Sequence, residues 1–429
     1  MSKGPYESVD IKEIDFGHII DVFDHPELAV GYDAAKHTHY ACIMAPDRQT
    51  YYLVRFDAQQ DIEHLEGLLE SLPADEITHV IEPTGSYSAP LRSTLQARGD
   101  EVRKMKPDKC GQADRLFDGV PSLHDGKSAY LVAQLYYLDL SQEWAERSEA
   151  AKRMRALHAR IEPAEDRLNR LSGRMEGLLA RFWPELTGYL DLTTASLQAL
   201  LAQYGSPKQV AENAAGAREL LKDVSRQMLA DDEIDAIVTS AAETTGEEPI
   251  EEHVEHIKDM AGQMRQVSRK LSRLESRLEE EVDESGDETA VGRISEFGGP
   301  KLATAIAGQM GLPDDYEYAG QFEKAAGLNL KEKSSGEAEG ERSITKRGPG
   351  QVRKYLYLLA CRMIGKDGCP YVDAWYRKRL EANGGHGLKA LVAVMRKLVA
   401  AIFHIGRGAA YRPAKLFDLE PREVMPAAE

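Results

Sequence analysis

Residues 28–58, LAVGYDAAKHTHYACIMAPDRQTYYLVRFDA, decide the fold of the first part of this chain. They contain three apolar or alternating runs, LAVGYDA, HYACIMAP and TYYLVRFDA, which are separated by turn-forming residues. Such runs are typical of short strands, and their close spacing predicts an antiparallel meander.

The stretch that follows alternates between helical and strand patterns. DIEHLEGLLESL predicts a helix, ITHVIEPTG a buried strand, YSAPLRSTLQARG a helix that ends at a glycine, and EVRKMK an edge strand. A last helix begins near His124 and continues through AYLVAQLYYL. The order β-β-β-α-β-α-β-α is that of a ribonuclease H-like domain, so we expect this α/β fold over residues 28–140. Residues 1–27 have little pattern and are expected to form an N-terminal extension.

Residues 141–290 are expected to be almost entirely helical. Apolar residues keep a 4-3 spacing in two long stretches, from Leu157 to Phe182 and from Ile257 to Leu278. Such spacing gives each helix a narrow apolar seam for a partner helix, so this segment is predicted to be a coiled coil. Periodicity does not decide whether the two helices pair within one chain or across a dimer.

Residues 291–412 are expected to form a second, mainly helical globular domain. EFGGPKLATAIAGQMG resembles a glycine turn followed by a helix, and such a turn can bind phosphate through free backbone N–H groups, although a plain helix turn is the commoner explanation. Glycine, serine and charged residues between Lys333 and Gly350 predict a loop. Residues 413–429 are expected to be a loosely ordered tail.

Charge is unevenly distributed along the chain. The chain has 429 residues and a net charge of -17, but Arg342–Arg412 contains fifteen Lys or Arg and three acids, so it carries +12 and the remainder -29. A basic segment on an acidic protein can bind phosphate, or it can simply be a solvated helix face. The candidate nucleic-acid-binding residues are Arg342, Lys346, Arg347, Arg353 and Lys354.

The four cysteines and the apolar segments point to the cytoplasm. Cys42, Cys110, Cys361 and Cys369 show no CxxC spacing, so we expect reduced thiols. The first residues are polar and acidic, unlike a signal peptide. The longest apolar stretch is interrupted by Arg396 and Lys397 and is too charged to span a bilayer.

Three carboxylates stand out in the first domain. Asp33 is expected in the middle of the first strand, Glu82 ends the fourth, and Asp125 opens the last helix. Each has an ordinary explanation, as a turn residue, as part of a helix-capping segment and as a helix-dipole partner respectively. In a ribonuclease H-like sheet, however, these three positions converge on one edge. Hard oxygen ligands at that edge suit Mg²⁺, and two such ions can assist phosphoryl transfer.

The ordered sequence blocks of the chain resemble a known family. The order and separation of seven blocks resemble those of the Piv-type DEDD recombinases, the bridge-RNA-guided transposases of insertion sequences. The blocks are GYDAAK, IEPTGSY, SAYLVA, FGGPKLATAIAGQMG, QFEKAAGL, the SSG step and SITKRGPGQVRKYLY. The resemblance covers most of residues 28–412. It implies a RuvC-like domain, a coiled coil and a transposase domain that carries a catalytic serine.

The resemblance also implies residues, a cofactor and partners. Carried over by motif, the ligands of Mg²⁺ fall on Asp33, Glu82 and Asp125, and the nucleophile falls on Ser335. It implies a phosphoserine link to DNA, a structured guide RNA, and homodimers that assemble into a tetramer. No membrane partner is expected.

One position departs from the family pattern. The family usually has a second aspartate where this chain has Ser128, and a hydroxyl is a weaker, neutral ligand. Either three acids suffice, or Asp114 or Asp118 replaces the missing ligand, or this copy is impaired.

From the resemblance as a whole we expect an RNA-guided transposase that cuts and rejoins DNA through Ser335. The alternatives are a site-specific invertase without a guide RNA and a catalytically impaired nucleic-acid-binding descendant.

Overall fold

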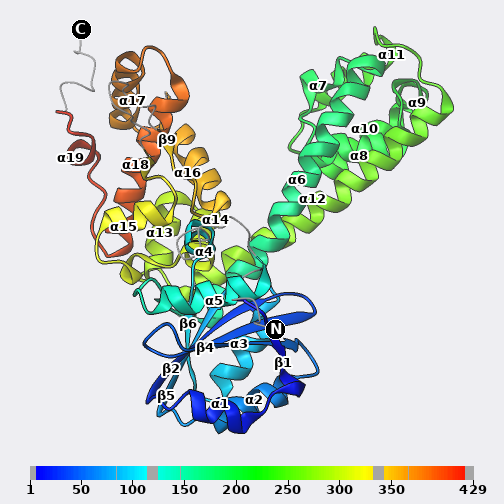
Figure 1. Ribbon diagram of the computed structural model, residues 1–429. Coiled ribbons are helices and arrows are strands. Elements are labelled where there is room, and N and C mark those ends of the chain that lie inside the picture. Colours follow the sequence, from blue (N-terminus) through cyan, green and yellow to red (C-terminus); the bar gives the residue numbers. More distant parts are fainter. Residues whose placement is uncertain are drawn as a thin grey trace. The chain divides into compact units, whose positions relative to one another are not determined.

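The computed structural model describes residues 6–83, 85–113, 124–144, 146–331, 343–365 and 367–420. The chain divides into two compact units, Met1–Glu146 and Arg147–Glu429. Figure 1 shows a sheet in the first unit and only short strands among the helices of the second. No helix among the described residues is long and apolar enough to cross a membrane.

The first unit is built on a mixed sheet. Its central strands are β2 (Glu27–Ala34), β3 (Thr38–Met44), β4 (Tyr51–Asp57), β5 (Glu76–Glu82) and β6 (Glu101–Lys104). They lie side by side in the order β4-β3-β2-β5-β6. β2, β3 and β4 are antiparallel neighbours, which confirms the predicted meander, while β5 is parallel to β2 and β6 is parallel to β5.

Helices cover both faces of this sheet. The helices that follow β4, β5 and β6 are α2 (Ile62–Ser71), α3 (Ser88–Ala97) and, after the short α4 (Pro107–Ala113), α5 (Asp125–Tyr136). Apart from α4, this is the predicted order of strands and helices. Figure 1 shows α5 on one side of the sheet and α2 and α3 on the other. The alternation of β2 explains this, because Val30 and Tyr32 join the core under α2 and α3, whereas Gly31 faces α5.

The segment before β2 is part of the fold, in contrast to the expected extension over residues 1–27. β1 (Val9–Asp10) pairs with β4, and α1 (Phe16–Val22) lies against the sheet. Ile11, Ile19 and Phe23 are buried in the same core as Val30. These apolar residues are separated by polar ones in very short elements, so no periodic pattern predicts a strand or a helix there. At the other edge, β7 (Gln142–Glu143) pairs with β6.

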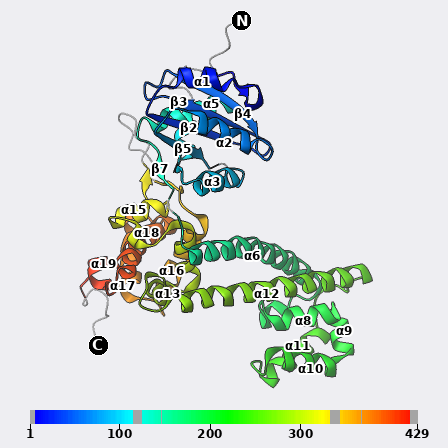
Figure 2. The same cartoon turned by 90° about the horizontal axis from the view of Figure 1, so that it is seen from below.

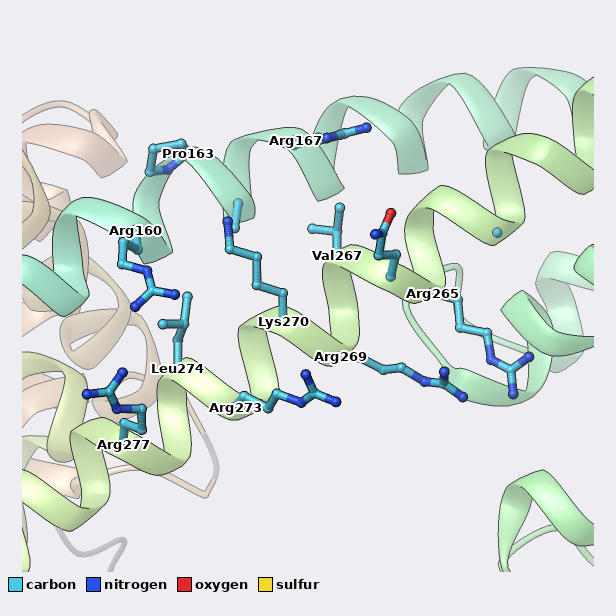
Figure 3. A pocket seen from close by; sticks show the side chains of 13 residues that line it. Arg160, Pro163, Arg167, Arg265, Val267, Arg269, Lys270, Arg273, Leu274 and Arg277 are labelled. Atoms are coloured by element: carbon cyan, nitrogen blue, oxygen red, sulfur yellow. The ribbon is translucent and has the colours of Figure 1, made fainter.

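Two long helices dominate the second unit. α6 (Glu149–Phe182) and α12 (Glu251–Ser285) lie side by side in Figures 1 and 2. Leu157 and Ile161 share a core with Leu274 and Leu278, while Met175 lies with the beginning of α12, so the helices are antiparallel. They therefore pair within one chain. Figure 3 shows the middle of the pair, where Pro163 lies inside α6 and removes one backbone donor.

Five shorter helices cover the far end of this pair. They are α7 (Leu186–Tyr189), α8 (Ala195–Tyr204), α9 (Pro207–Glu212), α10 (Ala214–Ser225) and α11 (Asp231–Ala242). Trp183 is fully buried where α6 ends, in a core that also takes side chains from α8, α10 and α11. The indole N–H of Trp183 donates to the Ser240 hydroxyl at 3.3 Å, which satisfies its one polar atom.

The remaining helices form the C-terminal core. They are α13 (Ala290–Gly298), α14 (Pro300–Ala305), α15 (Ala319–Ala325), α16 (Gly350–Met363), α17 (Pro370–Ala382), α18 (Gly387–Gly406) and α19 (Pro413–Phe417). α13 and α14 meet at Gly299, whose φ of 92° favours glycine.

Two features of this core differ from the expected segment boundaries. Met154 of α6 is buried among side chains of α14, α16 and α18, so the long helix starts inside the C-terminal core and not in a separate segment. Phe417 is 1% exposed and stacks edge-on against Trp375, so the start of the expected tail is anchored. Residues 421–429 lie outside the described part of the chain.

Candidate functional site

Asp33 and Glu82 lie next to each other at one edge of the sheet. They are register partners in the parallel strands β2 and β5, and each stands at or beside the end of its strand. Register partners point to the same face of a sheet. Gly31 and Val80, two residues earlier on each strand, both pack against α5, so Asp33 and Glu82 emerge on the α5 face.

Gly31 brings α5 unusually close to β2. A Cβ at this position would lie 2.5 Å from the Ala133 nitrogen and 2.6 Å from the Ala129 carbonyl oxygen. Only a residue without a side chain permits this approach of helix backbone to strand. Because Ala129 lies in the first turns of α5, the same approach sets the beginning of that helix beside the end of β2.

The beginning of α5 contributes a charge and a hydroxyl to Asp33. Burial raises the pKa of Asp33, the negative charge of Asp125 raises it further, and a hydrogen bond with Ser128 acts in the opposite direction. Asp125 is in the first helical turn, after the N-cap residue His124, whose side chain accepts from the Lys127 N–H at 3.4 Å. The structure thus brings Asp125 and Ser128 to Asp33.

Glu82 has a comparable environment on the neighbouring strand. Burial raises the pKa of its carboxyl, a hydrogen bond with Cys110 lowers it, and the negative charge of Asp33 raises it again. Two half-buried carboxylates of like charge are therefore held side by side, an arrangement that a proton or a cation stabilises.

The described side chains do not complete a metal site by themselves. Across residues 6–83, 85–113 and 124–144, as in the rest of the described chain, no three His, Cys, Asp or Glu side chains are grouped so as to hold a metal ion. A role in metal binding for Asp33, Glu82, Asp125 or Ser128 therefore stays a prediction. Asp114, Asp118, Ser334, Ser335 and Arg342 lie outside the described residues, so the predicted nucleophile has no described position here.

Two further residues beside this site were not singled out from the sequence. Cys110 of α4 is 4% exposed and bonds Glu82, although its spacing suggested only an ordinary thiol. Lys127, between Asp125 and Ser128, is 1% exposed, and its ammonium lies 5.8 Å from the centre of the Tyr6 ring. A lysine after Asp-Gly at a helix start resembles a solvated residue, and nothing in the sequence signals its burial.

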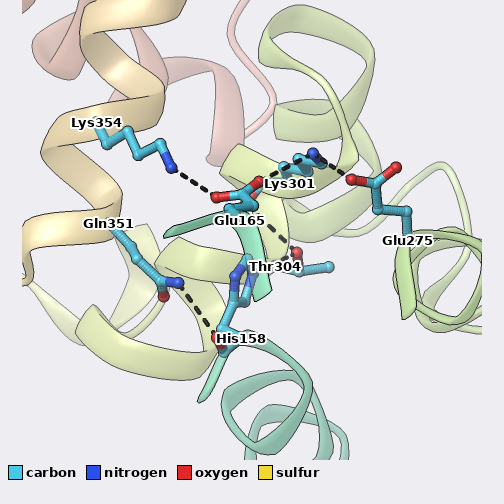
Figure 4. A network of polar contacts seen from close by, with 7 residues as sticks. All are labelled: His158, Glu165, Glu275, Lys301, Thr304, Gln351 and Lys354. Carbon is cyan, nitrogen blue, oxygen red and sulfur yellow. Dashed lines mark hydrogen bonds and ion pairs between the residues drawn. The ribbon is translucent and has the colours of Figure 1, made fainter. Parts of the chain in front are cut away.

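Part of the predicted basic surface is engaged inside the chain. Lys354 binds Glu165 of α6 at 2.6 Å, and Glu165 also binds Lys301 at 3.2 Å (Figure 4). In the same network Gln351 donates to the His158 carbonyl oxygen at 3.2 Å, and the His158 ring lies 3.0 Å from the Thr304 hydroxyl. These contacts tie α16 and α14 to α6, so Lys354 has a structural partner.

Other cations of the 342–412 segment also contact carbonyl oxygens or carboxylates of the protein. Arg353 donates to the carbonyl oxygens of Ala326 and Gly348, at 3.3 and 2.5 Å. Among the described residues of the segment, further ion pairs join Arg377 to Asp373, Arg396 to Glu323 and Arg407 to Asp314. Lys346, by contrast, is exposed in a left-handed turn with φ of 56°. Nucleic-acid binding by Lys346, Arg347, Arg353 and Lys354 stays a prediction, but Arg353 and Lys354 already have protein partners.

Comparison with known families identifies the chain. Residues 30–184 match a family model for the IS110-type DEDD transposases, described as "Transposase". Residues 281–377 match a second model, described as "Transposase IS116/IS110/IS902 family". No curated protein matches the chain. The two matches together span more than half of the sequence, and the mixed sheet of the first unit is consistent with a ribonuclease H-like DEDD domain. The chain belongs to the IS110-type DEDD transposase family, whose members transpose and recombine DNA.

Proposed function

We propose that this chain is an RNA-guided DNA transposase in which Ser335 attacks a DNA phosphate, assisted by Mg²⁺ on the carboxylate cluster. The observation that carries the proposal is the register pairing of Asp33 with Glu82 on the face that α5 approaches. The role of Ser335, the guide RNA and the assembly of dimers into a tetramer rest on the family resemblance.

Mg²⁺ fits the donors at this edge of the sheet. Asp33, Glu82 and Asp125 offer hard carboxylate oxygens, and burial has already raised the pKa of the first two. Mg²⁺ is usually bound by one or two carboxylates, while waters and substrate phosphates complete its shell, so a dedicated cage of protein ligands is not required. When bound, the ion would supply charge stabilisation for the attacking and leaving oxygens.

The residues of the chain have distinct tasks in this proposal. Asp33 and Glu82 fix the position of the cation, and Ser128 orients the Asp33 carboxylate through its hydrogen bond. Asp125 adds negative charge at the helix start, where the helix dipole stabilises it. The Ser335 hydroxyl loses its proton and its oxygen forms a bond to phosphorus, while the bond from phosphorus to a deoxyribose oxygen breaks and that oxygen takes up a proton. In the reverse exchange a deoxyribose hydroxyl displaces Ser335 and rejoins the strands.

Ser128 supports one competing function. A hydroxyl stands where the family usually has an acid, which favours a catalytically impaired descendant that binds nucleic acid without cutting it. A site-specific invertase without a guide RNA is the other alternative, and it differs only in the need for RNA.

The deciding experiment is a strand-exchange assay with the full chain and DNA that carries the ends of the element. Reactions with and without RNA transcribed from the flanking non-coding DNA, and with Mg²⁺ or a chelator, separate the alternatives. We expect joined product only with both RNA and Mg²⁺. Product without RNA would support the invertase, and DNA binding without product under all conditions would support the impaired descendant.

A further inference from the structure

A basic groove runs along the paired helices α6 and α12. It has a volume of about 870 Å³, and α6 contributes Arg160 and Arg167 to its lining. α12 contributes Lys270 and a series of arginines (Figure 3). No carboxylate is among the lining residues, on a protein whose net charge is -17.

The arginines of α12 follow the helix period. Arg265, Arg269, Arg273 and Arg277 are spaced by four residues, so their side chains form a ladder along one side of the helix. Four residues advance an α-helix by about 6 Å, so the ladder extends over roughly 18 Å. The apolar seam that holds α12 against α6 consists of other residues, among them Leu271 and Leu278, so the arginines are not needed to pair the helices.

Several cations of this unit are paired with carboxylates, whereas the described part of the chain offers the groove cations no such partner. Within the described parts of the chain, none of the seven forms an ion pair, and Arg167 donates only to the Gln263 side chain, at 3.2 Å. Lys354 and Arg396, by contrast, are each held by a glutamate. Like charges four residues apart destabilise a helix, and the described residues supply no carboxylate that offsets this repulsion in the ladder.

The composition of the lining selects the kind of anion. An arginine series on a rigid helix matches a regular array of phosphates, because a duplex carries about one charge per 1.7 Å of its axis. Binding of single strands relies on aromatic platforms for the bases. The lining between the cations consists of Pro163, Ala164, Gly262, Gln266, Val267 and Leu274, none of which can stack on a base.

We propose that this basic groove binds the phosphate backbone of duplex DNA, independently of its sequence. This inference rests on the proposed function, because the groove would give a DNA transposase a second surface for binding DNA. The ladder from Arg265 to Arg277 lies between the two family matches, which end at residue 184 and begin at residue 281. Neither family match therefore accounts for it.

The test compares two triple variants with equal charge changes. Arg269, Arg273 and Arg277, all exposed, are replaced by Gln in the groove variant. The control variant replaces Lys208, Arg218 and Lys222 by Gln, three cations of the distal region that are each paired with a carboxylate; Lys208 and Lys222 are exposed and Arg218 is half-buried. Binding of the full-length chain to a 30-base-pair duplex of arbitrary sequence is measured by fluorescence anisotropy over a salt series.

For the groove variant we expect a duplex affinity at least about tenfold lower at 0.1 M salt. We also expect a log–log salt slope that is shallower by roughly 2–3, close to one unit for each phosphate that the protein no longer neutralises. The control should retain the wild-type affinity and slope. A duplex RNA of equal length should show a smaller decrease in affinity in the groove variant. An equal decrease for RNA would overturn the assignment to DNA.

The remaining outcomes separate this inference from the proposed function. If the groove variant binds DNA like the wild type, the inference is wrong, while strand exchange can still proceed. If sedimentation shows that the groove variant changes only the oligomeric state, the groove belongs to a second copy of the chain and the inference is again wrong. If the wild type binds no duplex at all, both the inference and the proposed function fail.

Discussion

Asp33 and Glu82 are register partners in parallel strands, and burial raises the pKa of both carboxyls. The Ser128 hydroxyl at Asp33 and the Cys110 thiol at Glu82 partly offset this effect. In the metal-free protein, the burial of these two neighbouring carboxylates lowers the free energy of unfolding, and a bound cation can offset that loss. The edge is destabilised by the same groups that make it suitable for a cation.

Replacing Ser128 by Asp should couple stability to divalent cations. A carboxylate at this position adds a like charge beside Asp33, so the metal-free variant should be less stable than the wild type by about 1 kcal/mol. Added Mg²⁺ should raise its melting temperature more than that of the wild type. Ser128→Asn, which is neutral and of the same shape as Asp, serves as the control. A Mg²⁺ response of equal size in the Asp and Asn variants would contradict a ligand role at position 128.

Gly31→Ala should separate α5 from β2. Its Cβ would lie 2.5 Å from a backbone nitrogen of α5, and backbone cannot move aside as a flexible side chain can. We expect a decrease of about 1–3 kcal/mol in the free energy of unfolding, measured by urea denaturation, together with loss of strand exchange. Gly67→Ala in α2 is the control, because its Cβ would have no atom within 4 Å and alanine favours the helix.

His158 should make the stability of the second unit depend on pH. Burial lowers its pKa from 6.5 to about 4, with the charge of Glu165 opposing that shift. Between these values the unfolded chain binds a proton that the folded chain does not, so stability should fall as pH decreases from 6.5 to 4. The loss attributable to His158 is on the order of 3 kcal/mol.

The measurement is the difference in the free energy of unfolding between the wild type and His158→Gln across this pH range. The variant should be less sensitive to acid, even if it is less stable at pH 7 because the imidazole no longer bonds Thr304. His18→Gln, at an exposed site in the first unit, should follow the wild type. Parallel pH profiles for the wild type and His158→Gln would show that His158 is not the titrating group.

Lys346 and Arg353 should respond differently to the same substitution. Lys346 is exposed, so Lys346→Gln should reduce the salt slope of DNA binding by about 1 and leave the melting temperature unchanged. Arg353→Gln should instead lower stability by about 1–3 kcal/mol, because the carbonyls of Ala326 and Gly348 lose their donor. If both variants bind DNA like the wild type, the 342–412 segment is not part of the binding surface.

Much of the first unit was predictable because its signals are local. The meander and α2, α3 and α5 follow from apolar runs that a short window of sequence contains, and the same runs assign Asp33 to β2 and Glu82 to β5. β1 and α1 were missed because β1 has two residues and α1 has seven, which is too short for a clear period. The partners of Lys354 and Arg396 were missed because Glu165 and Glu323 are distant in sequence. In α12 the apolar seam dominates the sequence pattern. That the arginines beside it have no ion-pair partner within the described chain depends on the fold, so the sequence pattern does not predict it.

Ser335→Ala should abolish strand exchange while leaving DNA and RNA binding close to the wild type, because only the attacking oxygen is removed. Ser334→Ala is the matched control and should keep most activity, since it removes the hydroxyl of the adjacent residue and leaves Ser335 in place. Ser335→Cys should retain at most a trace, because a thiolate attacks phosphorus but is a poor partner for Mg²⁺. Mass spectrometry of trapped protein–DNA complexes should find the phosphodiester on Ser335. An adduct on Ser334, Ser343 or a tyrosine would reassign the nucleophile, and full activity of Ser335→Ala would exclude the serine mechanism.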